Sequence, residues 1–177
     1  MLSYLKENPS TVHHYQVIVI HVGTNWLSTK IEFGLYLQFI NDIITKESYE
    51  QQITSLNPAP ANGPATVFKD TIKEIIHLIK SQNQLAKILV SAIIPRSWDH
   101  DRRNLVRISY NNLLKNLARE ENTYFIETYS PFFDGNKNLK SQLFSYDGLH
   151  LSPAGSWVLK TFLCDKIARA LKNKLVM

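Results

Sequence analysis

QVIVIHV, residues 16–22, is a β-branched apolar run bounded by polar residues and by Gly23. A continuous apolar run of this length predicts a strand buried on both faces, as the strands of parallel sheets are. KILVSAII, residues 87–94, is a second such run and is stopped by Pro95. TYFIE, residues 123–127, is a third and shorter one. The sequence therefore predicts a sheet that contains these three strands.

Helical patterns separate the predicted strands. Apolar residues recur at three- and four-residue spacing before the second strand and again before the third, which indicates amphipathic helices. The two sets are Val67, Ile72, Ile75, Ile76 and Ile79, then Leu105, Ile108, Leu113, Leu114 and Leu117. A closing helix is expected over residues 152–174, with Ser152 as its N-cap and Pro153 as its first residue. Shorter helices are expected at residues 2–6 and 36–44.

This alternation predicts an α/β fold, a three-layer α/β/α sandwich around a parallel sheet with right-handed crossovers. The 177 residues are expected to form one domain, 1–177. Residues 46–66 contain Asn57-Pro58, Pro60 and Asn62-Gly63-Pro64, which predict a long surface loop inserted beside the carboxyl ends of the strands.

Charge and cysteine content restrict the partners and the compartment. The net charge of +5 raises the odds of an anionic partner, but the cations are scattered and form no basic helix face, so nucleic-acid binding is not favoured. The single cysteine, Cys164, excludes an internal disulfide, and its apolar helical surroundings predict a buried thiol. The amino-terminal residues lack the apolar stretch of a signal peptide, and no apolar run reaches the ~20 residues that span a bilayer. We therefore expect an intracellular, cytoplasmic protein.

DGLHLSPAG, residues 147–155, places an acid and a histidine three positions apart just ahead of the closing helix. A carboxylate beside one imidazole nitrogen fixes the tautomer, so that the other nitrogen can accept a proton from a hydroxyl. Gly148, between Asp147 and His150, permits the tight turn that this contact needs. A capping aspartate next to a surface histidine would show the same pattern.

Gly23-Thr24-Asn25 follows the first predicted strand. Catalytic residues of such sheets lie just beyond the carboxyl ends of the strands. Asn25 and His150 are therefore expected at the same edge of the sheet, the rim formed by those carboxyl ends. An asparagine amide there can donate a hydrogen bond to a developing oxyanion. Asparagine after a strand is also a common turn residue.

Together, HVGTN (residues 21–25) and DGLHLSPAG resemble the Gly-x-Asn-Asp and Asp-x-x-His blocks of the SGNH hydrolase family, also called GDSL-type esterases and lipases. The resemblance runs from about residue 15 to residue 171. It implies a flavodoxin-like sheet and hydrolysis of acyl or acetyl esters without a metal or organic cofactor. It also implies that Asn25 is an oxyanion-hole donor, that His150 is the general base and Asp147 its orienting acid, and that Gly23 shapes the loop that presents Asn25. Similar sequences occur as esterase-like domains in retroelement proteins, which suggests an origin of that kind.

Two departures from the family pattern concern the chemistry. Trp26 stands where the family has an aspartate, and the chain contains no Asp-Ser dipeptide, so the family's nucleophile block is missing. Ser28 and Ser152 lie near the other site residues, but neither follows the sharp strand-to-helix turn that exposes an attacking hydroxyl. In the family that block ends the first strand, which pairs with the strand predicted at residues 16–22 of this chain. We therefore expect the later part of a longer SGNH domain, lacking its first strand or strands and inactive by itself.

The alternative is a non-catalytic interaction module, or pseudoenzyme, that keeps the fold without the chemistry. Trp26 and the missing serine favour it, whereas Asp147 and His150 argue against it. An in-frame Gly-Asp-Ser block in the coding sequence ahead of Met1 would discriminate between the two. No metal is expected, because the histidines lack ligand spacing apart from Asp99-His100-Asp101, which is more simply a solvated turn on a loop.

Overall fold

The computed structural model describes residues 2–23, 45, 47–48, 51–52, 64–97 and 101–172. Asn25, Trp26 and Ser28, the helix predicted at residues 36–44 and most of the loop predicted at residues 46–66 lie outside these residues.

A parallel sheet of three strands forms the middle of the structure, as the apolar runs predict. Its strands are β1 (Val17–Ile20), β2 (Lys87–Ser91) and β3 (Tyr124–Ile126), and they pair in the order β1-β2-β3. Val19 pairs with Leu89, which in turn pairs with Tyr124. Each strand is shorter than the run that predicts it.

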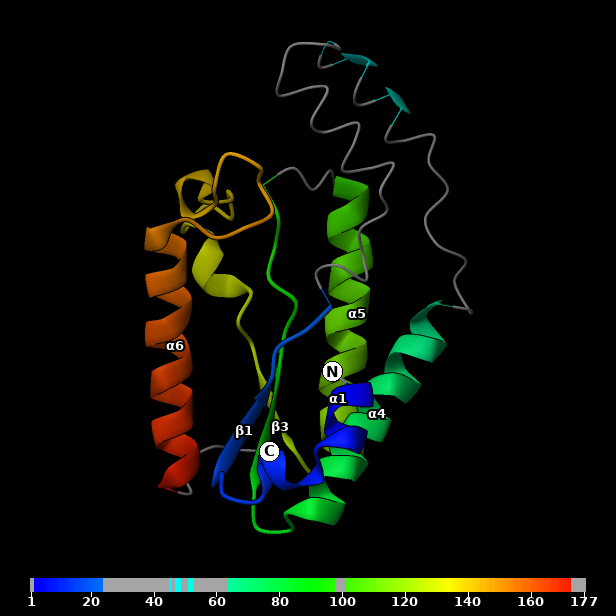
Figure 1. The fold of residues 1–177 in the computed structure, drawn as a ribbon. Helices are drawn as coiled ribbons and strands as arrows, with labels where there is room; N and C mark the ends of the chain where they lie inside the picture. The colour runs from blue at the N-terminus through cyan, green and yellow to red at the C-terminus, as the bar shows by residue number, and fades with distance from the viewer. Residues whose placement is uncertain are drawn as a thin grey trace.

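The long helices cover both faces of the sheet, so that the domain has three layers (Figure 1). The helices are α1 (Leu2–Glu7), α4 (Pro64–Gln82), α5 (Asp101–Glu120) and α6 (Pro153–Leu171). In Figure 1, α6 lies on one side of the sheet and α1, α4 and α5 lie on the other. None of the helices in the described ranges is long and apolar enough to cross a membrane.

Two helices begin earlier than expected. Helix α4 starts at Pro64, so the end of the predicted loop is helical, in keeping with the preference of proline for the first position of a helix. Residues 47–48 and 51–52, also within that loop, are helical as well. Helix α5 starts at Asp101, so this residue of the Asp99-His100-Asp101 triplet belongs to a helix and not to a loop. Helix α6 begins as predicted, because the Ser152 hydroxyl accepts a hydrogen bond from the Gly155 N–H at 3.2 Å.

The two faces of the sheet are buried by different helices. Ile20, Ile88 and Val90 pack with the buried isoleucines of α4 and with Leu114 and Leu117 of α5. Leu89 and Ile126 point the other way, toward Ala170 and partly buried residues of α6. Burying a large aliphatic side chain stabilises a fold by about 1.5–3 kcal/mol, so this double burial accounts for the continuous apolar runs in the sequence.

Cys164 is exposed, which contradicts the buried thiol predicted from its neighbours. Helix α6 turns Leu163 and Ile167 toward the sheet. The position after Leu163 is rotated about 100° around the helix axis, which takes the Cys164 side chain away from that face.

Candidate active site

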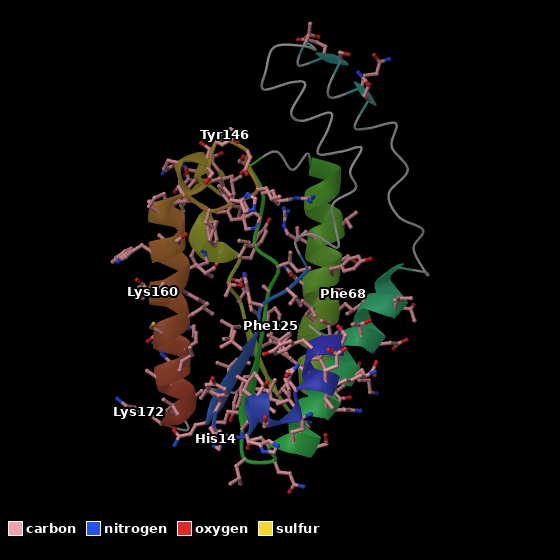
Figure 2. The ribbon with its side chains drawn as sticks, viewed as in Figure 1. His14, Phe68, Phe125, Tyr146, Lys160 and Lys172 are labelled. Atoms are coloured by element: carbon pink, nitrogen blue, oxygen red, sulfur yellow. The ribbon has the colours of Figure 1, made fainter. Side chains whose placement is uncertain are left out.

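The loop that carries Asp147 and His150 lies beyond the carboxyl end of β2 and is held at several points. Phe144 and Leu151 form an antiparallel bridge at its base, and the Ser145 N–H donates to the His150 carbonyl at 2.7 Å. The Ser97 N–H, on the segment that follows β2, donates to the Gly148 carbonyl at 2.9 Å. The label of Tyr146 in Figure 2 marks this loop, at the end of the molecule toward which the strands run.

Asp147 and His150 are in direct contact. His150 Nδ1 lies 2.5 Å from Asp147 Oδ2, and Asp147 Oδ1 accepts the backbone N–H groups of Leu149 at 2.9 Å and His150 at 3.0 Å. The Asp147 side chain is 14% exposed, whereas the His150 side chain is 75% exposed. With the carboxylate accepting from Nδ1–H, Nε2 carries the free lone pair of the ring.

Hydrogen bonds keep the Asp147 carboxyl ionised. Its burial by itself raises the pKa, but the hydrogen bonds from the His150 ring and from the N–H groups of His150 and Leu149 lower it more. The net pKa of Asp147 is below its ordinary value. The group is therefore a carboxylate at neutral pH, which is the form that can orient an imidazole and stabilise an imidazolium.

Glycine is required at two points near this rim. Gly148 has φ +64°, a conformation that most L-residues avoid, and it makes the turn between Asp147 and His150. Gly23, which follows β1, has φ +114°, and a Cβ there would lie 2.7 Å from Ile93 Cδ1. Gly23 thus packs closely against Ile93, on the segment that follows β2.

A network of hydrogen-bonded polar side chains, which the sequence patterns did not predict, links the carboxyl ends of the three strands. His21 Nδ1 lies 2.6 Å from Ser91 Oγ, and Ser91 Oγ lies 2.9 Å from Thr128 Oγ1, which donates to the Ala92 carbonyl at 2.7 Å. His21 as a residue is exposed, but its ring nitrogen is partly buried against Ser91, and burial lowers the pKa of the ring. The sequence signal that could have revealed this network is the polar residue at or just after the end of each strand.

A second histidine–carboxylate pair lies away from this rim. His77 Nε2 is 2.7 Å from Glu121 Oε2, and Glu121 also pairs with Lys73 at 3.4 Å. Glu121 precedes β3, so this pair sits at the amino end of that strand, the end of a parallel sheet where chemistry is not expected. His77 therefore provides a matched comparison for His150.

Among the residues that the structure describes, no group of three or more histidine, cysteine, aspartate or glutamate side chains is arranged to hold a metal ion. The arrangement at Asp147 and His150 suits proton transfer: a fixed carboxylate holds one ring nitrogen, and the other is open to solvent.

Comparisons with known proteins agree with the fold and with the sequence blocks. The sequence matches the GDSL-like lipase/acylhydrolase family over residues 3–158. A comparison with curated protein sequences gave no match.

Solved structures of esterases share the fold. A catalytic mutant of Axe2, an acetylxylan esterase from Geobacillus stearothermophilus, is 16% identical with a TM-score of 0.59, and the match covers 94% of this chain and 67% of that one. A GDSL-like lipase from Bacteroides thetaiotaomicron is 19% identical with a TM-score of 0.55, over 88% of this chain and 63% of that one. The esterase domain of the ORF1 protein from the zebrafish ZfL2-1 retrotransposon is 20% identical with a TM-score of 0.51, over 67% and 68% of the two chains.

The matched part thus spans about two thirds of the length of these structures. At such identities the likeness is one of fold. The family match covers most of the sequence and includes the loop with Asp147 and His150, and the chain therefore belongs to the GDSL-like lipase/acylhydrolase family.

Proposed function

We propose that this chain carries the general base and the orienting acid of an SGNH-type hydrolase that acts on carboxylic esters. His150 is the base and Asp147 is the acid that orients it. The observation that carries the proposal is the 2.5 Å contact between His150 Nδ1 and Asp147 Oδ2, with the rest of the ring exposed. In this proposal residues 1–177 form one partial SGNH domain.

The reaction would proceed through an acyl-enzyme. His150 Nε2 takes the proton of a serine hydroxyl as that oxygen attacks the ester carbonyl, and the Asp147 carboxylate stabilises the imidazolium that forms. The protonated ring then gives its proton to the departing alcohol. Water, deprotonated by His150, then attacks the acyl-serine, and the protonated ring returns its proton to the serine oxygen as the carboxylic acid is released. None of these steps needs a metal or an organic cofactor.

Asn25 would stabilise the tetrahedral oxyanion by donating a hydrogen bond from its amide, and Gly23 would set the direction of the loop that presents it. One such donor typically contributes about 2.7–4 kcal/mol to transition-state stabilisation. The φ of +114° at Gly23 supports this role, because residues other than glycine rarely adopt it and the position lies three residues beyond the end of β1.

Acyl or acetyl esters are the proposed substrates. The similar structures include an acetylxylan esterase and a retrotransposon esterase domain, which support this class. The serine would come from chain outside residues 1–177, because this sequence has no Asp-Ser dipeptide.

A chimera tests the proposal. The first strand and serine loop of the similar acetylxylan esterase are joined ahead of this chain, and hydrolysis of p-nitrophenyl acetate is measured. We expect activity that falls about 10²–10⁴-fold in His150→Ala, the range that a general base contributes. The matched control, His77→Ala, removes the other histidine of a carboxylate pair and should leave the rate unchanged. A folded chimera whose activity does not depend on His150 would refute the assignment.

The second candidate is a non-catalytic SGNH-fold interaction module, favoured by the absence of a Gly-Asp-Ser block and by Trp26. The two candidate functions predict different messenger RNAs. A transcript that encodes an in-frame Gly-Asp-Ser strand ahead of this sequence supports the hydrolase, and an expressed transcript without one supports the module.

A further inference from the structure

The network of His21, Ser91 and Thr128 begins where the backbone pairing of β1 with β2 ends. The last paired residues of these two strands are Ile20 and Val90. The same register places His21 beside Ser91, one step further along, and His21 Nδ1 lies 2.6 Å from Ser91 Oγ. A side-chain contact thus continues the pairing of the two strands beyond their backbone ladder.

The number of protons in this network determines the state of the His21 ring. His21 Nδ1 contacts Ser91 Oγ, and Ser91 Oγ lies 2.9 Å from Thr128 Oγ1. Thr128 Oγ1 in turn lies 2.7 Å from the Ala92 carbonyl oxygen. These three contacts need three protons, and the two hydroxyls supply one each. The Ala92 carbonyl supplies none, so the third proton comes from His21 Nδ1.

The alternative donations do not change this assignment. Ser91 Oγ also lies 3.0 Å from the Ala92 carbonyl oxygen, but a donation there would use the one proton that the Ser91 hydroxyl has. If Ser91 donated to His21 instead, one of the other two contacts would join two lone pairs. Ser91 is 1% exposed and Thr128 is 0% exposed, so water is not at hand to supply the missing proton.

The His21 ring is neutral at neutral pH, because burial lowers its pKa below the ordinary value of 6.5. Its single proton is therefore the one on Nδ1, and Nε2 carries the lone pair. The hydrogen bond to Ser91 is thus a neutral one, and it holds the residue that directly follows β1.

Gly23 lies two residues beyond His21 and is also held against the segment that follows β2. A Cβ at residue 23 would lie 2.7 Å from Ile93 Cδ1 and 3.2 Å from Phe68 Cζ. Glycine has no side chain with which to secure this position. The nearest side chain that ties this part of the chain to β2 by a hydrogen bond is that of His21.

We propose that His21 is a positioning residue for the turn at Gly23. By donating from Nδ1 to Ser91, it holds the end of β1 against the ends of β2 and β3, and it thereby fixes Val22 and Gly23 at the rim. The consequence for catalysis rests on the proposed function, in which Gly23 shapes the loop that presents Asn25. His21 itself contacts no reacting group in this proposal.

Two substitutions in the full chain test the role of the hydrogen bond. His21→Leu removes the donor and keeps an apolar side chain of similar reach, whereas His21→Asn places an amide N–H₂ where Nδ1 lies. Amide hydrogen exchange of Val22 and Gly23 should become about 2–10-fold faster in His21→Leu, the equivalent of one hydrogen bond, and should return to the parent rate in His21→Asn. Exchange within α4 should stay unchanged, which separates a local effect from a loss of overall stability.

Nitrogen-15 NMR of the full chain tests the tautomer. Protonated and unprotonated imidazole nitrogens differ widely in chemical shift, and the His21 signals are those that disappear in His21→Asn. At neutral pH we expect the proton on Nδ1 and none on Nε2.

The chimera that carries a serine loop tests the catalytic consequence. His21→Leu should lower its kcat by up to about 100-fold with little change in KM, because a misplaced catalytic loop loses rate and not ground-state binding. His21→Asn should restore kcat. A chimera that hydrolyses no ester would count against the proposed function, while exchange and NMR on the full chain would still decide the role of His21.

Three outcomes overturn the role of His21. The first is a proton on Nε2 in place of Nδ1. The second is exchange at Gly23 that is as slow in His21→Leu as in the parent protein. The third is equal acceleration in His21→Leu and His21→Asn, which would assign the effect to the lost packing of the ring and not to its hydrogen bond. An active chimera whose kcat is the same in His21→Leu would overturn the catalytic consequence.

Discussion

The side chain of Asn111, on α5, pairs with both backbone polar groups of Ile93, two residues beyond β2. Asn111 Oδ1 accepts the Ile93 N–H at 2.7 Å, and Asn111 Nδ2 donates to the Ile93 carbonyl at 3.1 Å. The amide thus takes the place of a neighbouring strand where the ladder has ended. The apolar run continues past Ser91 and stays buried because this side chain satisfies its backbone.

Asn111→Ala is therefore expected to lower the free energy of unfolding by about 2–4 kcal/mol, since it leaves a buried donor and a buried acceptor without a partner. Urea denaturation followed by circular dichroism measures the change. Asn112→Ala, at the exposed neighbouring position, is the control and should change stability by less than about 0.5 kcal/mol. Equal effects of the two substitutions would show that the Ile93 backbone finds water instead.

Gly155→Ala is expected to destabilise the contact between α6 and the loop that carries His150. A Cβ at residue 155 would lie 1.9 Å from the Leu143 carbonyl oxygen, so the helix must move. Strain of this kind typically costs about 1–3 kcal/mol or more. Gly135→Ala adds the same methyl group where nothing lies within 4 Å, and it serves as the control. Thermal unfolding of the two variants compares them, and a Gly155→Ala protein as stable as the Gly135→Ala protein would contradict the packing.

The sequence was sufficient to predict the strands and the start of α6, because both depend on local patterns. Those patterns are the apolar runs, and Ser152 ahead of Pro153. It was also sufficient for the contact between Asp147 and His150, which one tight turn brings together. It did not reveal that Asn111 faces Ile93 or that His21 meets Ser91. Those pairs form between residues far apart in the chain, and their geometry depends on how α5 and the strands pack. The exposure of Cys164 was missed for a similar reason, since apolar neighbours do not specify which side of a helix faces the sheet.

Asp147 should make stability depend on pH. Its pKa is lower in the folded protein than the ordinary value of 3.8, so the unfolded chain binds a proton more readily. The stabilisation is present in full above the ordinary pKa and is lost as the pH falls through the lower, folded pKa. Unfolding free energies of the parent protein and of Asp147→Asn, measured from pH 6 downward, should therefore converge below pH 3.8. A gap that stays constant across this range would mean that the carboxylate charge contributes nothing.

The chain by itself should hydrolyse p-nitrophenyl acetate no faster than its His150→Ala variant. A base exposed to solvent needs a hydroxyl held within hydrogen-bond reach to form an acyl-enzyme, and this sequence has no serine in a Gly-Asp-Ser block. The initial rates of the parent protein, His150→Ala and His77→Ala should agree once the rate given by free imidazole at equal concentration has been subtracted from each. A rate that falls by orders of magnitude in His150→Ala alone would reveal a nucleophile within these 177 residues, and Ser28 and Ser152 would then be substituted in turn to find it.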